Sequence, residues 1–117
     1  MADTRDIVER YFTAWTTNDV DGAYALLAPD LEFTGPTGSY TSAEAFRPAL
    51  VKFAAIAKHA KAVEMLAQGD RAALLYDCEL PAPVGTVRIA SFFRVAGGKI
   101  RWYDTRFDAT EFRKLQR

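Results

Sequence analysis

Apolar and polar residues alternate along the last third of the chain, and this alternation predicts three long antiparallel strands. The strands are expected at residues 71–80, 86–95 and 100–107, where β-branched and aromatic residues are frequent. A Pro-Ala-Pro-Val-Gly segment separates the first two strands, because proline lacks the amide donor that a sheet requires. An Ala-Gly-Gly-Lys segment predicts a hairpin turn before the third strand, since glycine tolerates positive φ angles.

The alternation separates the side chains of these strands into two unlike faces. We expect the face with few charges to lie beneath the helices, and it carries Leu74, Tyr76, Ile89, Phe93, Tyr103 and Phe107. The opposite face mixes Phe92 and Trp102 with ionic residues, namely Asp77, Glu79, Arg88, Arg94, Asp104 and Arg106. Strict alternation also assigns Ile100 to this outer face. Because large aromatic groups are unfavourable in water, we expect a twin subunit to cover Phe92 and Trp102, giving a homodimer.

The residues before these strands follow a helical period instead. Apolar residues at three- and four-residue steps predict a first helix that ends near Thr16, with Ile7, Val8, Tyr11, Phe12 and Trp15 on one stripe. A second helix is expected from Val20 to Leu27, where Pro29 closes it. Ser42 is expected to cap a third helix, which contains Pro48 and ends near His59.

The remaining segments complete an α+β architecture. Short strands are expected at residues 31–34 and 39–41, a longer strand at 60–67, and a final short helix after the capping-box pattern at 108–111. We therefore expect one domain over residues 1–117, in which three N-terminal helices pack on one face of a curved, mainly antiparallel sheet.

The charge balance and the lengths of the apolar runs argue against two classes of binding partner, nucleic acids and membranes. Lys plus Arg and Asp plus Glu number 15 each and form no basic cluster, which argues against nucleic acid. No apolar run approaches the ~20 residues of a membrane span, and the N-terminus has no apolar signal core. We therefore expect a soluble cytoplasmic protein that does not bind membranes.

Candidate chemistry is sparse. The single His59 makes a metal site improbable and is expected to be solvated, and no glycine-rich phosphate loop follows a strand. Cys78 lies on an apolar strand face and is expected to be a buried, inert thiol. We expect no metal and no cofactor.

Two stretches, RYFTAWTTNDVDGAYALLAPDLEFTGPTG near the start and FFRVAGGKIRWYDTRFDATEF near the end, resemble a known superfamily. This is the nuclear-transport-factor-2-like superfamily, which includes ketosteroid isomerases, limonene-epoxide hydrolases and SnoaL-like polyketide cyclases. The resemblance covers nearly the whole chain and implies a cone whose helices and bent sheet enclose a pocket. It is specific for the fold and not for the reaction, because this fold carries many chemistries.

Alignment with the ketosteroid isomerases argues against isomerase chemistry of that kind. The oxyanion tyrosine of that family falls on Tyr11, the second oxyanion donor falls on Ser91, and the base aspartate falls on Gly35. The sequence therefore keeps the tyrosine, has only a hydroxyl at the second position and lacks the base. A positioned proton-transfer group contributes roughly 10²–10⁴-fold to such reactions.

A second alignment leaves a hydrolytic alternative open. The second aspartate of limonene-epoxide hydrolase falls on Thr105, and its Arg-x-Asp pair falls near Tyr76 and Cys78. A slip of one residue in strand register would turn Asp77 and Asp104 inward, where they would flank an arginine, Arg88. The same slip would turn six apolar or aromatic residues outward, so the sequence favours the unslipped register.

Three hypotheses follow for the function. The preferred one is a domain that binds a small apolar, steroid-like or polyketide-like molecule in a tyrosine-lined pocket. The residues expected to line that pocket are Tyr11, Trp15, Phe33, Gly35, Tyr40, Phe53, Tyr76, Cys78, Ser91, Phe93, Tyr103 and Thr105. The alternatives are a SnoaL-like cyclase or epoxide-hydrolase-like enzyme that uses Asp77 or Asp104, and a dimerising accessory domain without a ligand.

Overall fold

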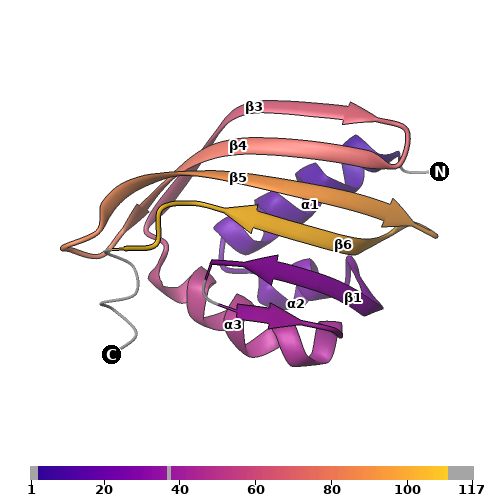
Figure 1. Cartoon of the computed structure of the whole chain (residues 1–117), viewed down its shortest axis with the longest axis horizontal. Coiled ribbons are helices and arrows are strands. Elements are labelled where there is room, and N and C mark those ends of the chain that lie inside the picture. The colour runs from indigo at the N-terminus through magenta and orange to yellow at the C-terminus, as the bar shows by residue number, and fades with distance from the viewer. Residues whose placement is uncertain (1–2, 37, 111–117) are drawn as a thin grey trace.

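The computed structural model describes residues 3–36 and 38–110, which form a curved sheet of six strands with helices on one side (Figure 1). The helices are α1 (Thr4–Thr16), α2 (Val20–Tyr24) and α3 (Ala43–Ile56). The strands are β1 (Leu27–Gly35), β2 (Gly38–Tyr40), β3 (His59–Gln68), β4 (Arg71–Leu80), β5 (Gly85–Ala96) and β6 (Lys99–Arg106). The predicted α+β architecture is confirmed. The predicted final helix lies outside the described residues.

The sheet has the order β2-β1-β6-β5-β4-β3, so the first hairpin lies at one edge and β3 at the other. All neighbours pair antiparallel except β1 and β6, which are parallel. Helix α1 contacts β3 to β6, whereas α3 contacts β1 and β2. The two long helices therefore cover different halves of the same sheet face.

Local sequence explains where the helices begin. The Asp3 carboxylate accepts a hydrogen bond from the amide of Asp6, and the Ser42 hydroxyl accepts one from Ala45, so both long helices are capped by side chains. The predicted apolar stripe of α1 is buried at Ile7, Val8, Tyr11 and Trp15, whereas Phe12 is half-buried. Pro48 lies in the second turn of α3 and is exposed.

The prediction of a second helix through Leu27 is wrong. Helix α2 ends at Tyr24, and Leu27 already pairs with Ile100 in the parallel β1–β6 ladder. Pro29 lies inside β1, where the register shifts between Leu27 and Glu32. A proline is tolerated at such an interruption because no ladder bond needs its missing amide donor.

The prediction that His59 ends the third helix is also wrong. Helix α3 ends at Ile56, and the amide of Lys58 donates a hydrogen bond to the carbonyl of Glu79 at 2.9 Å. That bond starts the β3–β4 ladder, so exposed His59 is the first residue of β3.

The register of the three long strands confirms the predicted faces. Tyr76 is opposite Ile89, and Phe93 is opposite Tyr103, and all four are buried. One assignment is wrong, because Ile100 is fully buried rather than on the outer face. The pairing passes from Arg94–Trp102 to Val95–Ile100, and this bulge reverses the alternation at the start of β6.

Candidate functional site

A cavity of about 320 Å³ opens between the sheet, α1 and α3. Most of the side chains predicted to line a pocket do line it: Tyr11, Trp15, Phe33, Gly35, Tyr40, Phe53, Tyr76, Tyr103 and Thr105. The other three predicted residues, Cys78, Ser91 and Phe93, are buried in the sheet and do not line the cavity. Several further residues line the cavity and were not predicted, among them Ala49, Lys52 and Ile56 of α3. Their helical spacing with Phe53 places them on one face of the helix, which is the signal that could have identified them.

Aromatic rings form the walls of the cavity and hold one another in place. Phe33 stacks on Phe46 with ring centroids 4.3 Å apart. Trp15 packs edge-on against Phe53 at 5.5 Å and Tyr76 at 5.7 Å. Such arrangements are favourable beyond the area that they bury, so the walls form a predominantly apolar and well-packed surface.

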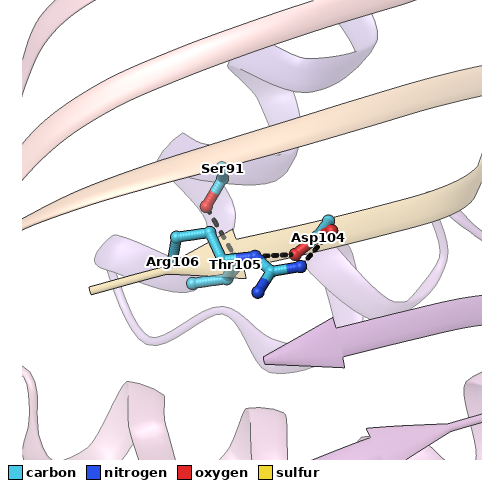
Figure 2. A network of polar contacts seen from close by, with 4 residues as sticks. All are labelled: Ser91, Asp104, Thr105 and Arg106. Carbon is cyan, nitrogen blue, oxygen red and sulfur yellow. Dashed lines mark hydrogen bonds and ion pairs between the residues drawn. The ribbon is translucent and has the colours of Figure 1, made fainter. Parts of the chain in front are cut away.

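Hydroxyl groups collect at the inner end of the cavity. Ser91 of β5 and Thr105 of β6 are opposite each other, and their side-chain oxygens are 3.0 Å apart (Figure 2). Tyr11, Tyr76 and Tyr103 surround this pair with phenols that are each at most 6% exposed. Within the described part of the chain, the buried hydroxyl of Tyr11 has no hydrogen-bond partner.

Burial keeps these phenols neutral. It is the main cause that raises the pKa of Tyr11 and of Tyr76 well above the ordinary value, and the neighbouring Tyr103 raises both further. Burial also raises the pKa of Tyr103, although the nearby hydroxyls of Tyr11, Thr105 and Ser91 oppose the shift. At neutral pH these groups are therefore hydrogen-bond donors and not bases.

The described lining of the cavity contains no Asp or Glu side chain. At Gly35, the position that resembles the isomerase base, an added Cβ would lie 2.9 Å from the ring of Phe33. Phe33 therefore occupies the space through which a longer side chain at residue 35 would enter. The described residues of the lining therefore do not supply the carboxylate that proton abstraction would use.

Asp77 and Asp104 lie on the outer face of the sheet, which contradicts the slipped register. Asp77 is opposite Arg88, which donates two hydrogen bonds to it at 2.8 and 3.0 Å. Arg106 binds Asp104 in the same two-pronged way, also at 2.8 and 3.0 Å (Figure 2). The hydrogen bond from Arg88 lowers the pKa of Asp77, opposite to what a general acid requires. The hypothesis of a hydrolytic site built from these two carboxylates inside the cone is therefore wrong.

The other candidate groups lie away from the cavity. His59 is exposed at the start of β3. Cys78 is buried, and burial raises the pKa of its thiol to about 11, so the thiolate is scarce at neutral pH. Residues 3–36 and 38–110 contain no group of three His, Cys, Asp or Glu side chains that could hold a metal ion. No helix in these ranges is long and apolar enough to cross a membrane.

The outer face of the sheet carries exposed apolar groups. Phe92 is 44% exposed, and Leu66 of the edge strand β3 is 63% exposed. The two lie in one cross-strand row, because Leu66 is opposite Ala73 and Ala73 is opposite Phe92. Trp102 is half-buried, with the guanidinium of Arg94 5.1 Å from its ring centroid. Alternation in the sequence predicts Phe92 and Trp102 on this face but not Leu66, because β3 shows little alternation.

Comparison with solved structures places the fold among known proteins. A protein from Kribbella flavida superposes with a TM-score of 0.88 and 29% identity, over 95% of this chain and 91% of the other. A Sinorhizobium meliloti protein, named provisionally as a polyketide cyclase, matches with a TM-score of 0.78, 24% identity and 86% and 94% coverage. A protein from Catenulispora acidiphila, described as having a ketosteroid isomerase-like fold in complex with trimethylamine, matches at 0.75, 19% identity and 92% and 89% coverage.

The family itself follows from the sequence. A comparison with curated proteins found no match. The model of the SnoaL-like domain matches residues 8–103, which is most of the chain. The chain therefore belongs to the SnoaL-like domain family, within the nuclear-transport-factor-2-like superfamily.

Proposed function

We propose that residues 1–117 act as a single SnoaL-like domain that binds a small, largely apolar molecule in the cavity beneath the sheet. The observation that carries this proposal is an aromatic cavity whose inner end holds a buried Tyr11 hydroxyl with no hydrogen-bond partner among residues 3–36 and 38–110. Leaving a buried donor unpaired is unfavourable, and an oxygen of a ligand would satisfy it. The volume of about 320 Å³ lies at the small end of the range for ligand pockets, roughly 300–1,000 Å³.

The expected ligand is a steroid-like or polyketide-like compound with an oxygen at one end. Tyr11 would donate to that oxygen, and the aromatic walls would contact the apolar body. If the bound molecule also reacts, Tyr11 would stabilise charge that develops on this oxygen, while the fit to the walls would position the reacting atoms. The cyclase alternative therefore rests on Tyr11, and substitutions of Asp77 and Asp104 to Asn should leave binding and turnover unchanged.

We further propose that two copies associate through the outer sheet face, with Leu66, Phe92 and Trp102 at the joint. These residues would otherwise expose large apolar groups next to one another. If the third hypothesis were correct, this association would be the entire function, and no compound would bind in the cavity.

Thermal unfolding with steroid-like and polyketide-like compounds tests the proposed binding. A ligand that fills the cavity should raise the melting temperature, because binding stabilises only the folded chain. Ala49→Trp, which fills the cavity from α3, should abolish the shift. Val51→Trp is the matched control, since Val51 is 45% exposed on the same helix and does not line the cavity. Shifts that Ala49→Trp leaves intact would contradict the proposal, and so would the absence of any shift.

A further inference from the structure

We propose that Lys52 selects a ligand with a negative charge at the mouth of the cavity. This inference rests on the proposed binding function and deepens it. The ligand would then be an amphiphilic anion, with an oxygen acceptor at its inner end, an apolar body and a carboxylate or similar acidic group at the rim.

The charge distribution around the cavity supports this inference. Among the described residues that line the cavity, Lys52 is the only one with a charged side chain. Lys52 lies one helical turn from Pro48 and one from Ile56, which also line the cavity, and Lys52 and Pro48 are both exposed. The lysine is therefore a rim residue, whose apolar stem can lie along the cavity wall while its ammonium stays in water.

The ammonium of Lys52 makes no polar contact that would stabilise the described part of the fold. In the described part of the chain, Lys52 forms no ion pair and no side-chain hydrogen bond. Arg47, on the same helix, shows the contrast. It forms an ion pair with Asp21, and its guanidinium lies 4.4 Å from the ring centroid of Tyr24. Of these two cations on α3, only Lys52 is available to a ligand.

The two ends of the cavity set different requirements for a ligand. At the inner end, neutral phenols and hydroxyls can satisfy an oxygen but offer no opposite charge, so burying an ion there would be strongly unfavourable. At the rim, exposed Lys52 places a positive charge beside the apolar lining. An anionic group fits the rim, and a cationic group is repelled from it.

Three matched probes test the inference: a hydroxynaphthoate, the corresponding neutral hydroxynaphthamide and the corresponding protonated hydroxynaphthylmethylamine. Their dissociation constants would be measured by calorimetry at low and high salt. We expect the carboxylate to bind best and the ammonium worst. A solvent-exposed pair should favour the carboxylate over the amide about two- to fivefold at low salt, and high salt should reduce that ratio by screening.

Variants at residue 52 separate the charge from the shape of the side chain. Lys52→Gln should bring the carboxylate-to-amide ratio to about one, and Lys52→Arg should keep the preference. Lys58→Gln is the control, because Lys58 is an exposed lysine just beyond α3 that does not line the cavity. Circular dichroism would verify that each variant is folded.

The outcomes separate this inference from the function on which it rests. Equal binding of amide and carboxylate by the parent protein would overturn the role of Lys52 and leave the binding function intact. So would a preference that Lys52→Gln does not change, or tighter binding of the ammonium probe. No binding of any probe, with Ala49→Trp and the parent behaving alike, would overturn both.

Discussion

Removing the hydroxyl of Tyr11 should make the ligand-free protein more stable. Tyr11 is fully buried, its ring packs edge-on against Tyr103 at 5.4 Å, and its hydroxyl has no partner among the residues that the structure describes. A buried donor that loses its hydrogen bonds to water without replacing them costs about 1–3 kcal/mol. Tyr11→Phe keeps the ring and removes that cost, so the free energy of unfolding should rise by up to about this amount.

Ser91→Ala is the matched control, and its effect should have the opposite sign. Ser91 is 1% exposed, and its hydroxyl shares a hydrogen bond of 3.0 Å with Thr105. Removing one partner leaves the Thr105 hydroxyl buried and unpaired, so the free energy of unfolding should fall by about 1–3 kcal/mol. The two substitutions each remove one hydroxyl from the same cluster, and they differ in whether that hydroxyl is paired.

Urea unfolding monitored by circular dichroism measures both effects, with equal m-values as the check that neither variant alters the denatured state. The same two variants would be titrated with a hydroxynaphthoate. Tyr11→Phe should weaken binding although it stabilises the protein, which would identify the hydroxyl as a group kept for a ligand. A loss of stability on Tyr11→Phe similar to that on Ser91→Ala would refute the reasoning, because it would show that the Tyr11 hydroxyl is already paired, for instance with Tyr103.

Three further predictions concern other parts of the account. Above about pH 10 the free energy of unfolding should fall, because burial raises the pKa of Tyr11 in the folded chain and this phenol then ionises only in the unfolded chain. Urea unfolding measured across that pH range should show a smaller decline for Tyr11→Phe. Gly35→Asp should destabilise by about 1–3 kcal/mol through the contact with Phe33, and calorimetry should show a smaller loss in a Phe33→Leu background, whereas equal losses would contradict the steric argument. Phe92→Asp combined with Trp102→Asp should give monomers in size-exclusion chromatography with light scattering, and a persisting dimer would exclude that joint.

Patterns that depend on neighbouring residues were predicted well from the sequence. The period of two in β4, β5 and β6 identified the buried face because a one-residue slip would have exposed Tyr76, Phe93 and Tyr103 together. The same reasoning identified most of the residues that line the cavity, since these come from the predicted inner faces of α1 and the sheet. The position of Asp77 and Asp104 on the outer face follows from the same register.

Features that depend on distant pairing were not predicted. Leu27 continues a helical pattern in sequence, and only its ladder with Ile100 makes it part of a strand. The bulge opposite Val95 reverses the alternation in β6, and no local signal marked it. Lys52 shares a helical face with Phe53, but only the packing of α3 against the sheet places that face at the rim of the cavity. Tertiary contacts decided each of these positions over local preference.

The most direct test of the binding claim is a crystal structure of the protein grown with a hydroxynaphthoate. We expect ligand density within the cavity, with an oxygen at hydrogen-bonding distance of the Tyr11 hydroxyl and the carboxylate toward Lys52. Ligand density confined to the outer face of the sheet would contradict the binding claim. A ligand bound elsewhere while protein side chains fill the cavity would contradict it as well.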